Sequence, residues 1–329
     1  SASLIPDDIK IKIGSGYSSN FLRFSDYELN NLSNNILVLG DSDTFDSPIV
    51  RYSLSASSEL NFMPIRIEWN LGVVDFTQSQ NKTTFSSGLI FSHRFGSFNW
   101  IKFGYKNIPK NYLRMYKDRD QIGSPLLSAD YSLERLFSSI SFPVYQQIWL
   151  RTQINRSSMY FNPAFTEFDL LQHQLVLKIY NINYYILNLS PFVMISESEN
   201  TTYKSGLFSN QTDRSYFEYG LGTDIKIENF KTIFFDDYKT ILSFKLREYI
   251  SSDLIDVLHN NRSHIEFEFL NKINKKINNN VDMSIYCKYT NRNTDALSEY
   301  IEDLKSYKNF ELGIDFLLNL TDTVYDFTY

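Results

Sequence analysis

The stretch Phe310-Glu311-Leu312-Gly313-Ile314-Asp315-Phe316-Leu317 alternates apolar and polar residues without a break. Because successive side chains of a β-strand point to opposite faces, this segment has one apolar face and one polar face. A strand of a soluble sandwich can show the same pattern. Here the pattern recurs about fourteen times along the chain, and such repetition is typical of a transmembrane β-barrel.

Working outward from this stretch, we find thirteen earlier segments with strand character. The clearest is 65–73, where five apolar residues alternate with Arg66, Glu68, Asn70 and Gly72. Pro191 lies inside another segment and predicts a bulge or a break in pairing there, since proline has no backbone donor. The expected strands are 9–17, 50–60, 65–73, 83–94, 98–107, 131–142, 145–155, 170–180, 184–196, 216–227, 239–249, 263–270 and 281–292.

The composition is compatible with a barrel and with few other membrane architectures. The mean hydropathy is -0.30, a value that polar lumen residues produce by offsetting the lipid-facing ones. Aromatic residues make up 16% of the 329 residues, and tyrosine suits a membrane interface. The longest uncharged run, 179–196, is interrupted by asparagines and Pro191, so we expect no transmembrane helix.

Charge and cysteine content exclude several classes of function. The net charge is -6, with 32 basic and 38 acidic residues well mixed, so nucleic acid is a poor partner. The single cysteine, Cys287, excludes an internal disulfide and any site with several cysteine ligands. We find no P-loop, dinucleotide fingerprint or HExxH-type motif and expect no cofactor. The start at Ser1-Ala2-Ser3 is interpreted as a mature form whose secretory signal has been removed.

The connections between the expected strands tend to alternate in length. Short turns on one side and long polar loops on the other are typical of outer-membrane barrels. The longest external loops are predicted at 25–48 and 108–128, and both termini then lie on the periplasmic side. We find no domain boundary and predict one barrel domain over 1–329. Residues 321–329 are either a C-terminal tail or a short last strand that ends on Tyr329.

Three features resemble outer-membrane β-barrel proteins of Gram-negative bacteria. Gly16-Tyr17-Ser18-Ser19-Asn20 is similar to the Gly-Tyr-Asp-Ser-Asn-type opening of such barrels, with Ser18 where aspartate is usual. The closing strand resembles the C-terminal signal that the barrel-insertion machinery reads, and the hairpin rhythm covers nearly the whole chain. The resemblance implies an all-β, antiparallel up-and-down barrel of about 14 strands (12–16) in the bacterial outer membrane. Its implied partners are the lipid bilayer with lipopolysaccharide, the insertion machinery during assembly, and a further outer-membrane protein or a second copy of the chain.

The polar faces of the strands define a set of candidate lumen residues. Strands up to 170–180 contribute mostly basic residues, whereas acidic residues gather from 216–227 onward. Such a wall either lines an open pore for small polar solutes or forms paired charges that plug the barrel. The candidates are Lys10, Lys12, Arg51, Arg66, Glu68, Lys102, Lys106, Arg151, Lys178, Glu218, Asp224, Lys245, Arg247, Glu266, Glu268, Lys288 and Arg292.

Two loops carry further candidates. The predicted loop 108–128 is either solvated or folded inward to narrow the pore, and its charged residues are Lys110, Arg114, Lys117, Asp118, Arg119 and Asp120. In the first loop, Asp41, Asp43 and Asp46 offer oxygen ligands for Ca²⁺. That loop has no glycine at the needed place and no bidentate glutamate, so we expect no metal site.

These observations leave two hypotheses for function. The first is a channel or passive transporter for small polar solutes. The second is a structural or interaction barrel with a plugged lumen, whose external loops bind a partner or a surface polymer. An enzyme of the outer-membrane lipase type would need a serine and a histidine close together. His93 and His173 have outward parity but lie on distant strands, so we expect no catalytic site.

Overall fold

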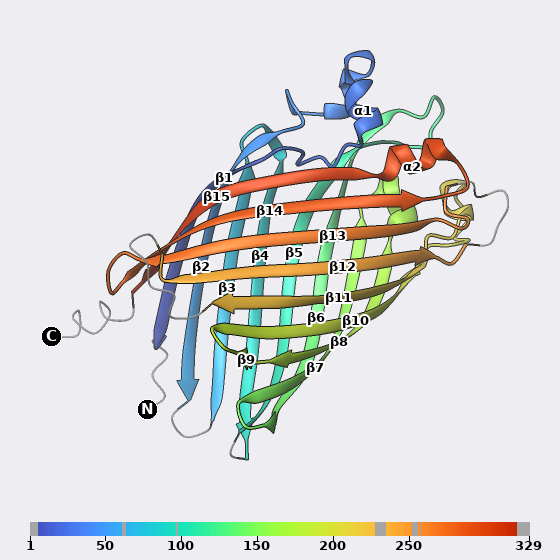
Figure 1. Cartoon of the computed structure of the whole chain (residues 1–329). Helices are drawn as coiled ribbons and strands as arrows, with labels where there is room; N and C mark the ends of the chain where they lie inside the picture. The colour runs from blue at the N-terminus through green and yellow to red at the C-terminus, as the bar shows by residue number, and fades with distance from the viewer. Residues whose placement is uncertain are drawn as a thin grey trace.

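The computed structural model describes residues 6–60, 64–96, 98–227, 235–251, 256 and 258–320. Within these ranges the chain forms a single antiparallel sheet that closes on itself as a barrel (Figure 1). The strands are β1 (Asp8–Ser18), β2 (Ser47–Leu60), β3 (Ile65–Phe76), β4 (Ser79–Phe95), β5 (Asn99–Lys117), β6 (Leu126–Tyr145), β7 (Ile148–Phe161), β8 (Leu170–Tyr180), β9 (Ile182–Tyr184), β10 (Leu187–Asn200), β11 (Tyr216–Ile227), β12 (Asp237–Tyr249), β13 (Ser263–Lys276), β14 (Val281–Asp295) and β15 (Tyr307–Asn319).

The strand β9 continues β8 beyond Asn181, which has a positive φ of 61°, and pairs only with the start of β10. The described wall therefore holds fourteen strands, and the prediction of about fourteen is confirmed. The predicted break at Pro191 is also confirmed. On the β8 side, pairing stops at Leu189 and resumes at Phe192.

The barrel closes between its first and last strands. Gly14 of β1 lies opposite Asp315 of β15, and Gly16 lies opposite Gly313. This pairing leaves no open sheet edge that would attract another chain. An alanine at Gly16 would place its Cβ 2.6 Å from the Leu312 carbonyl oxygen and 2.7 Å from the Tyr286 hydroxyl, so this part of the seam requires residues without side chains.

The outer face of the barrel is apolar. Trp69, Phe103, Leu221, Phe244 and Ile285 are all exposed, although large apolar side chains of a soluble protein would normally gather in its core. Three further residues predicted to face lipid, namely Ile67, Phe267 and Ile314, have the same parity and are half-buried among neighbours. An apolar outer surface on a closed β-barrel is the arrangement that places strands in a lipid bilayer.

The two ends of the barrel differ. The turn end, at the lower left of Figure 1, carries the short hairpin connections, the start of β1 and the end of β15. The loop end carries α1 (Asp26–Asn30), α2 (Glu299–Lys305), the 3₁₀ turns η1 (Leu32–Asn34), η2 (Ile36–Leu39), η3 (Pro163–Phe168) and η4 (Ser209–Gln211), and the connections that join them. No helix in the described ranges is long and apolar enough to cross a membrane.

The main buried apolar cluster lies at the loop end. We call residues 19–46, which connect β1 to β2, the first loop. Its residues Phe21, Leu22, Phe24 and Leu39 pack together with Tyr112 of β5. Helix α1 begins with a capping box, in which Ser25 accepts from the Glu28 amide and Glu28 accepts from the Ser25 amide. The first loop is therefore a folded segment with its own core rather than the extended polar loop that its composition predicts.

The prediction of a second long loop at 108–128 is wrong. Strand β5 continues to Lys117, β6 begins at Leu126, and only residues 118–125 connect them. The pairing of β5 with β6 shifts register between Ile108 and Asn111 and again between Tyr112 and Arg114. Each β-bulge adds a residue to one strand and interrupts the alternation of its apolar and polar residues. The second half of β5 therefore lacks the regular alternation from which the strands were predicted.

The same region contains a split in the barrel wall. Pairing between β4 and β5 ends at Ser87 and Asn107, so the outer parts of the two strands diverge. The first loop fills the gap. Asp41 accepts hydrogen bonds from the Ser79 hydroxyl (2.8 Å) and the Asn81 amide (2.9 Å). These contacts replace part of the missing ladder.

Several smaller boundaries also differ from the prediction. The expected strands 131–142 and 145–155 leave Pro143 in the turn between them, whereas it lies inside β6 at an irregular pair with Trp149. Strand β13 continues to Lys276 instead of ending at Leu270, because its polar second half obscures the alternation. The expected tail or short strand at 321–329 lies outside the described residues.

Candidate functional site in the barrel lumen

The charged residues predicted for the lumen share the side of the sheet opposite to the exposed apolar residues. Their contacts show that they face a common interior. Lys178 of β8 reaches Asp224 of β11 over 3.0 Å, although β10 lies between these two strands. Lys239 of β12 contacts the same carboxylate at 3.2 Å. One acidic side chain thus gathers cations from two different strands.

On the wall formed by β11 to β15, acidic and basic residues form direct cross-strand pairs. Glu218 lies opposite Arg247, and their side chains are 2.8 Å apart. Glu266 lies opposite both Lys245 and Arg292, and binds them at 3.8 and 2.7 Å. Opposite charges directly across an antiparallel ladder stabilise it. We call this side the paired wall; it also includes the Lys288–Glu268 ion pair at 3.0 Å.

The seam of the barrel extends this pattern. Asp315 of β15 binds Lys12 of β1 at 2.7 Å and lies 4.0 Å from Arg51 of β2. The Arg51 guanidinium also donates to the hydroxyl of Tyr286 and lies over its ring. Lys10, nearer the turn end, binds Asp8. The acids of β11 to β15 are therefore largely neutralised by bases within the barrel.

The wall formed by β3 to β8, which we call the basic wall, has a different pattern. Lys106 lies directly opposite Arg135 across β5 and β6, and Arg151 lies directly opposite Lys178 across β7 and β8. Lys106 makes no hydrogen bond or ion pair with any residue in the described ranges, and it is exposed. Arg135 donates to the Ser157 hydroxyl at 2.9 Å. Like charges opposite each other are unfavourable; Lys178 is also paired with Asp224, whereas Lys106 and Arg135 have no acidic partner among the described residues.

Arg66 and Glu68 form the one predicted acid–base pair on this basic wall. The Arg66 Nε lies 3.1 Å from the Glu68 carboxylate, and a second nitrogen lies 3.8 Å from Glu59. Lys102, two strands away, has no ion-pair partner among the described residues. The uneven charge distribution that the sequence predicts is thus present in the cross-strand pairing.

The first loop, rather than the predicted loop 108–128, enters the mouth of the barrel. The turn Asn20–Phe24 is closed by the Asn20 amide, which donates to the Phe24 carbonyl (2.7 Å) while its oxygen accepts from the Phe24 amide (2.8 Å). This turn holds Arg23 with φ 56°, an uncommon value for a residue with a side chain. The exposed Arg23 guanidinium lies 5.7 Å from the ring of Tyr307 on β15.

The residues predicted to form a constriction are dispersed. Arg114 lies on β5, donates to Glu28 of the first loop through both terminal nitrogens, and stacks on Phe24. Lys110 and Lys117 are exposed on β5. Of the three residues in the turn that follows, Asp120 accepts from the Ser209 amide and hydroxyl, Asp118 is buried, and Arg119 is exposed. Of these residues, Arg114 binds the first loop directly, and Asp120 binds η4.

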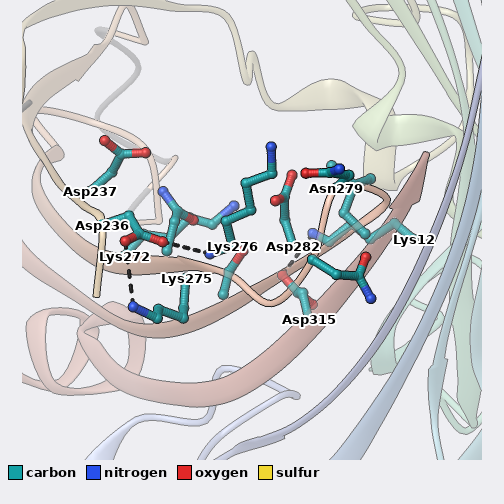
Figure 2. Close-up of a pocket in the computed structure, with 13 residues that line it drawn as sticks. Lys12, Asp236, Asp237, Lys272, Lys275, Lys276, Asn279, Asp282 and Asp315 are labelled. Carbon is teal, nitrogen blue, oxygen red and sulfur yellow. Dashed lines mark hydrogen bonds and ion pairs between the residues drawn. The ribbon is translucent and has the colours of Figure 1, made fainter. Parts of the chain in front are cut away.

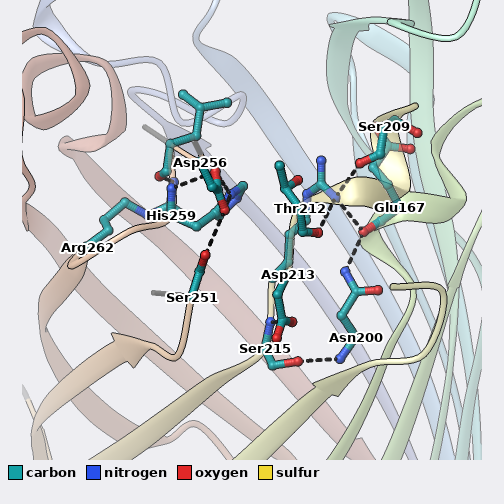
Figure 3. A network of polar contacts seen from close by, with 12 residues as sticks. Glu167, Asn200, Ser209, Thr212, Asp213, Ser215, Ser251, Asp256, His259 and Arg262 are labelled. Carbon is teal, nitrogen blue, oxygen red and sulfur yellow. Dashed lines mark hydrogen bonds and ion pairs between the residues drawn. The ribbon is translucent and has the colours of Figure 1, made fainter. Parts of the chain in front are cut away.

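A polar network ties the other loops together at the loop end (Figure 3). Arg214 donates to the carbonyls of Glu167 and Ser209 at 3.2 and 3.0 Å, and Asn200 donates to the Glu167 carbonyl at 2.7 Å. Burial raises the pKa of the Glu167 carboxyl and lowers the pKa of Arg214 to about 10. These contacts fix the loops over β7 to β11 and leave the basic wall beneath them.

A serine, a histidine and an aspartate also meet in this network, between β12 and β13. His259 Nδ1 lies 2.9 Å from the Asp256 carboxylate, and Ser251 donates to the same carboxylate at 3.1 Å. A nucleophilic serine would need to bond to the histidine, whereas here both side chains bond to the aspartate. His93 and His173 are on β4 and β8. The Asp256 carboxylate thus joins Ser251, just after β12, to His259, before β13.

The first-loop aspartates bind protein groups. Asp41 accepts from Ser79 and Asn81, Asp46 accepts from the Tyr17 hydroxyl, and Asp43 is exposed. In the described ranges no group of three or more histidine, cysteine, aspartate or glutamate residues is placed to hold a metal ion. Two of the three candidate Ca²⁺ ligands, Asp41 and Asp46, are thus bound to protein groups.

Two cavities line the lumen towards the turn end. One has a volume of about 720 Å³, and charged and amide side chains of β1, β12 to β15 and the β13–β14 turn surround it (Figure 2). Lys12 and Asp315 form an ion pair on one side of it, and Lys275 and Asp236 form another at 3.4 Å. A second cavity of about 290 Å³ lies against the basic wall.

The sequence analysis missed several of the residues that shape this interior. Arg135 was overlooked because alternation in the expected strand 131–142 is weak, although its parity with Lys106 follows once the strand is placed. Trp100 was not assigned to either face, because it lies near the start of the expected strand 98–107. Arg23 had no signal, since nothing in its neighbourhood predicts that a loop residue returns to the interior.

No protein-family model matches the chain, and no curated protein matches its sequence. Among solved structures the chain is similar to an anion-selective porin from Comamonas acidovorans, with 7% identity, a TM-score of 0.45, and 95% of this chain and 98% of that chain covered. It is also similar to the outer membrane protein OprD from Pseudomonas aeruginosa, with 9% identity, a TM-score of 0.46, and 96% and 95% covered. A third similar structure is OmpT, an outer membrane protein of Vibrio cholerae, with 7% identity, a TM-score of 0.46, and 95% and 96% covered. Values this low carry no information about substrate, and the barrel described above rests on its own strand pairing.

Proposed function

We propose that the chain forms a channel in the outer membrane of a Gram-negative bacterium, through which small polar solutes pass with a preference for anions. The observation that carries this proposal is the like-charge pair on the basic wall, Lys106 opposite Arg135, in which neither cation has an acidic partner among the described residues. A plugged, dry interior would have to neutralise such cations. A water-filled bore tolerates them and lets them concentrate anions from solution.

The location follows from the outer surface. A closed antiparallel barrel with exposed aromatic and aliphatic residues on its outside satisfies every strand edge and suits a lipid environment. The lipid bilayer with its lipopolysaccharide is then the partner of this surface, and the barrel-insertion machinery acts during assembly. Nothing in the mixed surface charge favours nucleic acid.

The alternative is an interaction barrel whose lumen is plugged. It is favoured by the apolar cluster of the first loop, which occupies part of the mouth and is anchored by Arg114 and Glu28. Against it stands Lys106, an exposed lysine on the inner side of β5 with no acidic partner among the described residues. A plugged lumen would have to bury this ammonium group without a counter-charge.

Single-channel recording in a planar bilayer tests the proposal. Purified protein should give steady conductance steps, and in a salt gradient its reversal potential should lie on the anion side. Neutralising Lys102, Lys106 and Arg151 together should move that potential toward cations. Absence of steps from a protein that shows heat-modifiable gel mobility would support the interaction barrel instead. A conducting triple variant with an unchanged potential would show that these side chains do not line the path.

A further inference from the structure

The cavity on the basic wall combines cations with two indole rings. It lies near the turn end, where Trp100 follows the β4–β5 hairpin and Trp149 lies at the start of β7. Its volume of about 290 Å³ is at the lower limit of small-molecule sites. The residues that line it are Arg66, Glu68, Ser92, Trp100, Lys102, Ser141, Trp149 and Arg151.

Strand register brings these residues together in two rows. Arg66 lies opposite Ser92, and Ser92 lies opposite Lys102. In the second row, Trp100 lies opposite Ser141, which in turn lies opposite Arg151. Neighbouring strands are about 4.8 Å apart, so residues two strands apart are separated by roughly 10 Å. The long side chains of Arg66, Lys102 and Arg151 therefore converge on one region of the wall.

Two of the three cations are held in place by other groups. The Arg66 guanidinium is fixed by Glu68 and by the Ser57 hydroxyl at 3.2 Å. Arg151 donates to the Ser141 hydroxyl at 3.0 Å and to the Tyr180 hydroxyl at 2.8 Å, and it stacks on the Tyr180 ring at 4.7 Å. Because Glu68 is already paired with Arg66, it leaves the charge of Arg151 uncompensated. A fixed guanidinium is a prepared donor for an anion.

Two further polar groups of the cavity, Lys102 and Ser92, lack side-chain partners among the described residues. Lys102 makes no hydrogen bond or ion pair with any part of the chain that the structure describes. The Ser92 side chain is only 1% exposed, and its hydroxyl has no hydrogen-bond partner in the described structure. Buried hydroxyls normally have a hydrogen-bond partner, and a ligand or water in the cavity would supply one for Ser92. Lys102 and Ser92 are direct cross-strand neighbours, so both face the same space.

The rings determine which anions fit. An inorganic ion or a short carboxylate needs only the cations and the hydroxyl. Two tryptophans on the same cavity add flat apolar surface that gains from contact with a ring or another planar apolar group. Within the proposed channel, on which this inference rests, we infer that this cavity is a binding site for small organic anions that carry a carboxylate and a flat apolar group.

The chain offers a direct optical test. It has three tryptophans, and the third, Trp69, is exposed on the outer face. In a Trp69→Phe background, tryptophan fluorescence therefore reports the cavity alone. Benzoate should quench it saturably in detergent-solubilised protein, acetate should bind about tenfold more weakly, and benzylammonium should have no saturable effect. A factor of ten corresponds to one modest interaction with the ring.

Variants separate this site from a general effect of charge. Lys102→Gln should raise the benzoate Kd about tenfold, the loss of one charge-assisted hydrogen bond, and Lys102→Arg should recover most of the affinity. Lys110→Gln is the matched control, since it removes a lysine from the same strand outside the cavity, and the Kd should stay unchanged. Trp100→Leu should reduce the preference for benzoate over acetate. Far-ultraviolet circular dichroism and heat-modifiable mobility confirm that each variant is folded.

The outcomes distinguish the site from the channel. Equal affinity for acetate and benzoate, or a Kd that Lys102→Gln leaves unchanged, would overturn the assigned site. Binding in detergent does not need an open pore, so a protein that binds benzoate but gives no conductance would overturn the channel and leave the site standing. A protein that conducts and shows no saturable quenching would overturn the site and leave the channel standing.

Discussion

Lys106 on β5 lies directly opposite Arg135 on β6, on the inner side of the barrel. On the other side of the lumen the equivalent relationship joins opposite charges, as in Glu218 with Arg247. The barrel therefore combines a wall that neutralises itself with a wall that does not. In the proposed channel, fixed positive charge on one side and neutral pairs on the other would produce a field across the lumen that favours anions near β3 to β8.

The first prediction concerns this like-charge pair. Lys106→Glu turns the contact with Arg135 into an opposite-charge pair, which should stabilise the ladder by roughly 0.2–1 kcal/mol. The same change should weaken the anion preference of the channel. Urea unfolding in detergent measures the first effect, and the reversal potential in a salt gradient measures the second. Lys106→Gln should give intermediate values of the stability and of the reversal potential. A stronger anion preference in the glutamate variant would contradict the inference that Lys106 faces the lumen.

The paired wall should respond in the opposite direction. Glu266→Gln removes the carboxylate that binds Arg292 and Lys245, which should cost about 1–3 kcal/mol because two partly buried cations lose their partner. The anion preference should increase. Glu268→Gln is the matched control, since this more exposed glutamate binds only Lys288 and its loss should cost less than about 1 kcal/mol. Equal urea midpoints for the two variants would show that the shared carboxylate has no special role.

The sequence predicted the barrel because its central evidence is periodic. Strands such as 170–180 and 216–227 coincide with β8 and β11, and the parity of Trp69, Phe103 and Phe244 is the parity observed. In a membrane barrel every strand has one face towards lipid and one towards the lumen, so apolar and polar residues alternate along every strand. The lumen candidates follow from the same parity, although their role in permeation stays a prediction.

What the sequence did not predict depends on tertiary contacts. Two bulges carried β5 through the predicted loop 108–128. Pro109 lies at the first of them, but a proline alone does not distinguish a bulge from a turn. The first loop has a polar composition, yet Phe21, Leu22 and Phe24 form its core with Tyr112, 88 residues from Phe24 along the chain (112 minus 24). The split between β4 and β5 has no sequence signal either, because it depends on Asp41 reaching a distant strand.

A substitution on the outer face tests the membrane orientation. Phe267→Arg places a charge on the lipid side of β13. The ring centroids of Phe267 and Phe244 are 4.8 Å apart on this face. Arginine near the bilayer midplane costs roughly 2–4 kcal/mol, so the yield of heat-modifiable barrel in the membrane should fall. Phe267→Leu is the control and should insert normally. Full insertion of the arginine variant would mean that this face does not contact lipid.

The anchoring of the first loop gives a fourth prediction. Arg114→Ala removes the bidentate contact with Glu28 and the stacking on Phe24. Hydrogen bonds to charged groups are worth about 1.5–3 kcal/mol, so the population with a released loop should rise roughly 10- to 100-fold. Arg23 is the single tryptic site within residues 19–46, and cleavage there should accelerate accordingly. Arg119→Ala, at an exposed arginine in the β5–β6 turn, should leave cleavage slow. Unchanged cleavage in Arg114→Ala would show that the apolar cluster alone holds the loop.

The last prediction is a pH dependence of the loop between β12 and β13. Burial lowers the pKa of His259 to about 4 from its ordinary 6.5, although Asp256 opposes the shift. A released loop binds a proton at His259 below pH 6.5, whereas the packed loop does not until pH 4. The open form therefore holds more protons in this window, and the stability of the packed loop falls as the pH decreases from 6.5 to 4. Hydrogen exchange of residues 258–262 should accelerate over this range by more than its intrinsic pH dependence accounts for. His259→Gln should abolish the extra acceleration, and its persistence in that variant would assign the effect to another group.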